Sequence, residues 1–161
     1  MRSVRFSRCL VAIATYSPSL QSRATQLPWQ GIHCTGHATL AWIGLNSSKQ
    51  LHPQHPVIVV QSNAEFGEAQ FEQAGLESAS SRPSDRLPVG QQLLTQAAAV
   101  TGEAWLAAPE VLQVHRWGYA FALSPIVARS LSAQTAAPLW FTGDWCGGNR
   151  VESAFLSGRA T

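Results

Sequence analysis

The residues best suited to chemistry lie near the end of the chain, at Gly143 and Asp144. An apolar run at 139–142 precedes them, a glycine-bearing loop at 146–149 follows, and a helical pattern opens at Val151. An acid at the end of a buried strand can accept hydrogen bonds from sugar or ribityl hydroxyls, and a helix N-terminus offers unpaired N–H groups and partial positive charge. Open α/β folds bind phosphate-bearing cofactors at such places. The alternative is structural, with Asp144 capping a turn and the glycines permitting tight backbone.

Two charged residues flank the predicted helix start. Arg150 could reach a phosphate or could simply be solvated. Glu152 would lie in the first helical turn, where a carboxylate favours the helix dipole without any further role. Both residues are therefore candidates for a cofactor site and both have a structural explanation.

Other ligand-type side chains are less convincing. His33, Cys34 and His37 lie within five residues, but no second cluster supplies the remaining ligands of a metal site, so no metal is predicted. Cys146 could be a nucleophile if a base lay nearby, and His115 is the one candidate base with structural context. Nothing in the sequence places these two together. The catalytic residues stay unknown.

Composition limits the class of protein. The chain has 161 residues, of which 45% are apolar and only 12% charged, with a formal net charge of +2, whereas an average globular domain is about 25% charged. Such low charge argues against disorder and against a nucleic-acid surface. Three cysteines without a CxxC pair indicate no disulfide framework, so a reducing, cytoplasmic location is the expectation. No apolar run is long enough to span a membrane.

The patterns predict a mixed α+β chain. Strands are expected at 4–16, 32–34, 39–45, 57–61 and 111–123, with helices at 64–73 and 89–100. A secretory signal is the alternative for the first stretch, but its apolar core is short. The stretch 78–85 is the most loop-like, and 126–137 holds a possible short helix. The alternating aromatic residues Trp117 and Tyr119 could flank a planar ligand but are more typical of core.

With these residues in hand, the sequence resembles the C-terminal part of FAD-dependent amine-oxidase-like oxidoreductases, of the renalase-like branch. Three segments carry the likeness: LPWQG at 27–31 with LAWIGLNSSK at 40–49, HRWGYAFA at 115–122, and LWFTGDWCGGNRVESAFLSGRA at 139–160. The third is the most specific, because it resembles the closing flavin motif of that family. The likeness covers essentially the whole chain.

The resemblance implies a fold class and a site. It implies a mixed, mainly antiparallel substrate-side sheet domain at 1–137, and at 138–161 the closing strand–loop–helix of a Rossmann-type FAD-binding domain. By resemblance, Gly143 and Asp144 would meet the ribityl or phosphate region of FAD, with Arg150 nearby. Val151 and Glu152 would approach the flavin ring at the helix N-terminus. The implied reaction is hydride transfer from a small substrate, of amine or reduced-nicotinamide type, to FAD.

The sequence departs from that family in lacking the N-terminal G-x-G-x-x-G fingerprint, and its last helical pattern stops at Thr161. The expectation is therefore a C-terminal fragment, a split-gene product or a truncated reading frame. Such a chain would bind FAD weakly or not at all alone, and a separately encoded N-terminal FAD-binding half is a candidate partner. The rival hypothesis is a non-catalytic remnant or small binding module without cofactor.

Overall fold

The computed structural model describes residues 4–79, 88–124, 128–133 and 135–161. In chain order the elements are β1 (Phe6–Thr15), the 3-10 turn η1 (Pro18–Leu20), α1 (Gln21–Thr25), β2 (Gly31–His33), β3 (Leu40–Leu45), η2 (Asn46–Lys49), β4 (Val57–Ser62), α2 (Ala64–Ala79), α3 (Pro88–Thr101), η4 (Ala104–Ala107), β5 (Val111–Ala122), β6 (Leu131–Ala133), β7 (Leu139–Phe141) and α4 (Val151–Gly158). Within the described ranges, no helix has the length and apolar character needed to cross a bilayer.

These elements form two compact units. One, here called the sheet unit, comprises Arg8–Trp117; the other, the terminal unit, comprises Met1–Ser7 and Gly118–Thr161. The domain boundary expected at 137/138 stays a prediction. The strands β1 and β5 have residues in both units.

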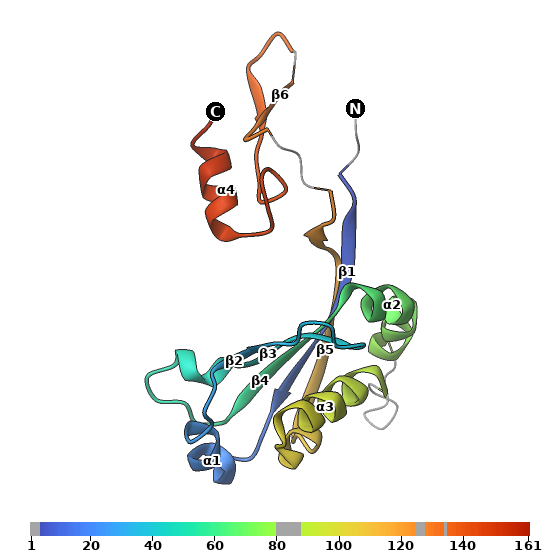
Figure 1. Cartoon of the computed structure of the whole chain (residues 1–161), viewed down its shortest axis with the longest axis vertical. Helices are drawn as coiled ribbons and strands as arrows, with labels where there is room; N and C mark the ends of the chain where they lie inside the picture. The colour runs from blue at the N-terminus through green and yellow to red at the C-terminus, as the bar shows by residue number, and fades with distance from the viewer. Residues whose placement is uncertain (1–3, 80–87, 125–127, 134) are drawn as a thin grey trace. The chain divides into compact units, whose positions relative to one another are not determined.

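A five-stranded antiparallel sheet is the centre of the fold, with strand order β2-β3-β4-β1-β5 (Figure 1). The predicted pairing of 32–34 with 39–45 is confirmed, since Ile32 lies opposite Ile43 in an antiparallel ladder. β4 pairs with both β3 and β1, so Val60 lies between Ile43 and Ala12. The expected α+β class with a mainly antiparallel sheet is therefore confirmed.

One face of this sheet carries the hydrophobic core. Alternate residues of β1 and β4, such as Ala12, Ile58 and Val60, are buried with Leu93 and Leu94 of α3. This arrangement follows from the period of two in strands and the apolar stripe predicted along α3. The sheet unit thus has a closed core of its own.

The helix α2 packs closely against β1. A Cβ added at Gly67 would lie 2.5 Å from the backbone oxygen of Arg8, so only glycine permits this approach. Asn63 caps the helix, because its Oδ1 accepts a hydrogen bond from the N–H of Phe66 at 2.8 Å. The predicted helix at 64–73 is confirmed, and it runs on to Ala79. Ser78 and Ala79 are therefore helical and not part of the predicted loop, while 80–85 lie outside the described residues.

The prediction that the aromatic face of 111–123 belongs to the core is wrong. Trp117 is 58% exposed and Tyr119 is 82% exposed. The other face of β5 is the one that packs inward, through Leu112 and Val114 against the core cluster. Arg116 on that inward face also stacks on the ring of Phe71 in α2, with 4.9 Å between the guanidinium carbon and the ring centroid.

Two expectations for the end of the chain also fail. Where 126–137 is described, at 128–133 and 135–137, it contains no helix but the short strand β6, whose Ser132 lies opposite Trp140 of β7. Residues 126, 127 and 134 lie outside the described residues. The run at 139–141 is a strand as predicted, but its three residues are exposed and not buried. The reason is that β6 and β7 form a sheet of only two strands, and no described layer covers its apolar residues.

Candidate functional site

The candidate site is the connection from β7 through the loop 142–150 into α4 (Figure 1). The helix begins at Val151 and carries Glu152 in its first turn, as the sequence predicted. No described side chain caps α4, because its N-cap residue is Arg150 in an extended conformation without a side-chain hydrogen bond. The N–H groups of the first turn are therefore left for water or for a ligand.

A single buried serine fixes this loop to the helix. Ser157, in the last turn of α4, accepts a hydrogen bond from the N–H of Gly143 at 3.0 Å and donates one to the carbonyl of Arg129. The side chain is 1% exposed. Because a buried hydroxyl that both donates and accepts is costly to remove, Ser157 determines where the loop begins relative to the helix.

An asparagine holds the other end of the loop. The amide of Asn149 accepts a hydrogen bond from the N–H of Ala122 at 2.6 Å and donates one to its carbonyl at 3.0 Å. This side chain thus pairs with the end of β5 as a neighbouring strand would. Sequence reasoning missed both Ser157 and Asn149, because the partners of each are up to 28 residues away in the chain and no local pattern marks them.

The glycines of the loop have two different roles. Gly143 leaves room for the indole of Trp145, since an added Cβ would lie 2.4 Å from its nitrogen and the indole would have to move. Gly147 and Gly148 have φ angles of 96° and 141°, which side-chain-bearing residues rarely adopt. A Cβ at Gly147 would meet nothing within 4 Å, so the backbone there is open to a ligand.

The charged candidates lie along this same connection. Asp144 is half-buried, whereas Arg150 and Glu152 are exposed. Among the described residues, the Asp144 carboxylate accepts no recorded hydrogen bond and Arg150 makes no ion pair. The structure therefore places Gly143, Asp144, Arg150, Val151 and Glu152 on one short segment, with the acid and the base free to meet a ligand.

The histidine and cysteine candidates do not form a recognisable metal or catalytic site among the described residues. Nδ1 of His37 accepts the N–H groups of Thr39 and Leu40 at 3.0 and 3.1 Å, so it fixes a turn. The described part of the chain holds no group of three or more His, Cys, Asp or Glu side chains arranged for a metal. Cys146 lies in the terminal unit and His115 in the sheet unit.

Two of the three thiols are shifted away from the reactive thiolate form. Burial raises the pKa of Cys9, and contacts with Ser62 oppose that rise only in part. Burial also raises the pKa of Cys34. Since the thiolate is the nucleophile, neither cysteine is suited to covalent catalysis at neutral pH.

Comparison with known proteins adds no assignment. No protein-family model matches the sequence, and no curated protein matches it significantly.

Proposed function

We propose that the chain is the C-terminal part of a FAD-dependent oxidoreductase that transfers a hydride from a small substrate to the flavin. The observation that supports this most is the uncapped start of α4, directly after a loop with two glycines in the left-handed region. The proposed family rests on the resemblance of residues 139–160 to its closing flavin motif. Over these residues the chain forms a strand, a loop and a helix, which is the order of elements that the motif needs.

The donor set of the loop fits the electron-rich flavin ring and the ribityl chain of the cofactor. Arg150 and the first-turn N–H groups of α4 offer positive charge and donors for an anion. The free carboxylate of Asp144 can accept hydrogen bonds from ribityl hydroxyls. Glu152 opposes a fully charged phosphate beside it, which favours placing the flavin ring and not the phosphate at the helix start.

When bound, the flavin supplies the hydride acceptor. The residues of this chain then have three tasks. The partial positive charge at the start of α4 stabilises negative charge that develops nearby. Ser157 and Asn149 keep the loop in one geometry, and the open backbone at Gly147 lets a planar group approach.

The exposed apolar residues of the terminal unit support the further proposal of a partner half. Leu139, Trp140 and Phe141 of β7 are all about half exposed, and Phe155 of α4 is 61% exposed. Large apolar side chains exposed on both faces of β7 and on α4 are typical of surfaces that another protein layer covers. A Rossmann-type half with a G-x-G-x-x-G strand–helix unit would supply that layer and the contacts to the ADP part of FAD.

An absorption scan tests the proposal. The chain is purified alone and after co-expression with a G-x-G-x-x-G half from the neighbouring reading frame, and each sample is scanned for bound flavin. We expect little or no flavin with the chain alone and stoichiometric flavin with the pair. A colourless, properly folded pair would favour the rival function, a binding module without a cofactor.

A further inference from the structure

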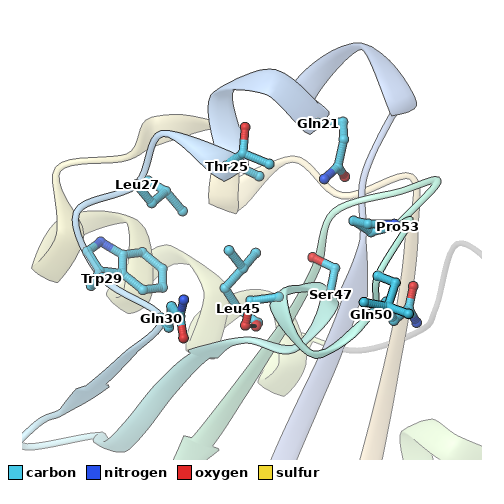
Figure 2. Close-up of a pocket in the computed structure, with 12 residues that line it drawn as sticks. Gln21, Thr25, Leu27, Trp29, Gln30, Leu45, Ser47, Gln50 and Pro53 are labelled. Carbon is cyan, nitrogen blue, oxygen red and sulfur yellow. Dashed lines mark hydrogen bonds between the residues drawn. The ribbon is translucent and has the colours of Figure 1, made fainter.

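The two edges of the five-stranded sheet differ in length and composition. At one edge β2 has only three residues, and the loop before it lines a pocket with Leu27, Trp29 and Gln30 (Figure 2). At the other edge β5 has twelve residues. Native sheets keep an exposed edge short or interrupt it with proline or charge, whereas the first five residues of β5, VLQVH, contain no proline, lysine, arginine or acid. The edge at β5 is therefore suited to pairing with a further strand.

The outer side of β5 is open along 111–117. Alternate backbone N–H and C=O groups of an edge strand point away from the sheet. Apart from the sheet ladder, no recorded hydrogen bond of the described residues involves the backbone of 111–117. Further along the same strand, the side-chain amide of Asn149 bonds both the N–H and the carbonyl of Ala122, as a neighbouring strand would. The open part of the edge has no such cover among the described residues.

Large apolar side chains flank this open edge. Val111 is 51% exposed and Trp117 is 58% exposed. Both lie on the face of β5 away from the core, because Leu112 and Val114 on the other face pack against the core cluster. A strand that pairs with β5 would reduce the exposure of this valine and this indole.

The same segment has one exposed charge of each sign near its ends. Glu110 continues the pairing of β5 with β1, since its N–H donates to the carbonyl of Thr15 at 2.9 Å. Neither Glu110 nor Arg116 makes an ion pair among the described residues. One Arg116 nitrogen donates to the carbonyl of Phe71 at 3.2 Å, but a guanidinium has five N–H donors. Its remaining donors can therefore meet a carboxylate.

We propose that this edge pairs with the same edge of a second copy of the chain, as antiparallel strands related by a two-fold axis at Gln113. In such a dimer, residues at equal distances before and after Gln113 lie opposite each other. Glu110 then lies opposite Arg116 of the second copy, so that opposite charges meet twice. An axis at Leu112 or Val114 would instead place each of these charges opposite an uncharged residue. Charge complementarity of the segment with itself thus favours a second copy and selects one register.

The apolar residues also match in this register. Leu112 lies opposite Val114 of the second copy on the face that carries the core, and the exposed Trp117 lies opposite Pro109 on the other face. Directly opposed apolar side chains of this kind stabilise antiparallel pairs. The proposal is independent of the proposed flavin function, because 109–117 belongs to the sheet unit and the flavin residues belong to the terminal unit.

Sedimentation equilibrium of the full chain, from about 10 µM to 1 mM, tests the oligomeric state. Paired edges of nine residues make a smaller contact than a standard interface, so we expect a reversible dimer with a Kd on the order of 100 µM. A chain that is still monomeric at 1 mM would overturn the proposal. So would assembly beyond the dimer, because a two-fold contact is closed.

Cysteine cross-linking tests the position of the axis, in a Cys34→Ser background where the remaining cysteines are buried. In Gln113→Cys the two thiols are directly opposed, with Cα atoms about 4.5–5.5 Å apart, which permits a disulfide. The control is His115→Cys, on the same face of the same strand, whose two copies are out of register by about 13 Å. We expect rapid cross-linking under mild oxidation only at position 113. No cross-link there, or equal cross-linking in the control, would contradict this register.

Two side-chain variants test the complementarity itself. Trp117→Ala should weaken dimerisation about tenfold or more, as expected for a central tryptophan. Glu110→Lys, which places a lysine opposite Arg116, should weaken it about five- to tenfold. Leu51→Ala removes an equally apolar side chain that is 95% exposed and distant from β5 in the sequence, and should leave dimerisation unchanged. If either Trp117→Ala or Glu110→Lys folds normally and dimerises as tightly as the native chain, the proposal fails.

Discussion

The sheet unit and the terminal unit bury their apolar side chains to very different extents. The sheet unit has a contiguous core in which Leu10, Ile43, Ile58 and Leu93 are fully buried. Among the described residues of the terminal unit, the buried apolar side chains are small, Ala122 and Cys146, while larger ones on β7 and α4 are exposed. The first unit is therefore held by hydrophobic burial, and the second by a few polar contacts such as those of Ser157 and Asn149.

This difference indicates what each unit can do alone. A closed core accounts for a unit that folds by itself and can hold a pre-formed pocket. A unit without such a core depends on further contacts to become rigid. Under the proposed function, a partner half would supply these contacts and complete the cofactor site. The predictions below test that difference.

The largest effect is expected from a matched pair of leucine truncations. Leu93→Ala in α3 opens a cavity in a fully buried site and should lower the free energy of unfolding by about 2–5 kcal/mol. Leu139→Ala in β7, where the side chain is 48% exposed, should change it by less than about 0.5 kcal/mol. Denaturant unfolding measures both. Equal losses in the two variants would show that the terminal unit has a core after all.

Two glycine substitutions should change the free energy of unfolding in opposite directions. Gly67→Ala places a methyl group 2.5 Å from the backbone oxygen of Arg8, so the close packing of α2 on β1 must yield, at a cost of about 1–3 kcal/mol. Gly158→Ala in α4 meets no atom within 4 Å and should stabilise by up to about 1 kcal/mol through helix propensity. Thermal unfolding distinguishes them; stabilisation by Gly67→Ala would contradict the packing described.

Loss of the Ser157 hydroxyl should loosen the candidate site locally. Ser157→Ala leaves the N–H of Gly143 and the carbonyl of Arg129 without this partner, a local cost of about 1–3 kcal/mol. Hydrogen exchange at the Gly143 amide should therefore become faster. The control is Ser132→Ala, an exposed serine on β6 whose recorded bond is to its own neighbour. If hydrogen exchange at the Gly143 amide is unchanged in Ser157→Ala, the Ser157 hydroxyl does not hold the loop in place.

The smallest expected effect is an alkaline loss of stability in the sheet unit. Burial raises the pKa of Cys9 in the folded chain above its ordinary value of 9.0. Around and above that pH the unfolded chain loses this proton while the folded chain keeps it. The protonated Cys9 thiol therefore contributes its full share of the free energy of unfolding below about pH 9. This share is lost as the pH rises through the pKa of Cys9 in the folded chain.

Tyr16 also lowers the free energy of unfolding as the pH rises, but at higher pH, because burial raises the pKa of its hydroxyl as well. Unfolding free energies measured from pH 7 to 10.5 should be flat at first and then fall. Cys9→Ala should reduce the slope near pH 9. An identical slope in this variant would show that the buried thiol is not the cause.

Much of the fold was predictable from local patterns. The strands β1, β3, β4 and β5 and the helix α3 follow from alternation and from an apolar stripe of helical period. The start of α4 at Val151 was also predicted, because a loop and an acidic first turn mark it.

The wrong predictions of burial share one cause. The pattern of apolar residues shows which side chains share a face of a strand, but not whether another element covers that face. Alternation put Trp117 and Tyr119 on one face of β5 correctly, but only the packing of Leu112 and Val114 decides which face is buried. The same holds for β7, whose apolar run reads as buried yet is exposed. Ser157 and Asn149 were missed because their partners are distant in sequence.

The measurement that tests the central claim most directly is NMR mapping of FMN and ADP, each at millimolar concentration, on the chain alone. Under the proposed function, the loop meets the ribityl or phosphate region of FAD and the start of α4 meets the flavin ring, while the ADP half is held by the N-terminal fingerprint that this sequence lacks. The account predicts weak, saturable FMN-induced shifts of the backbone amides from Gly143 to Ser153, which Asp144→Ala diminishes, and no comparable shifts with ADP. Equal shifts with ADP, or FMN shifts confined to other parts of the chain, would contradict it.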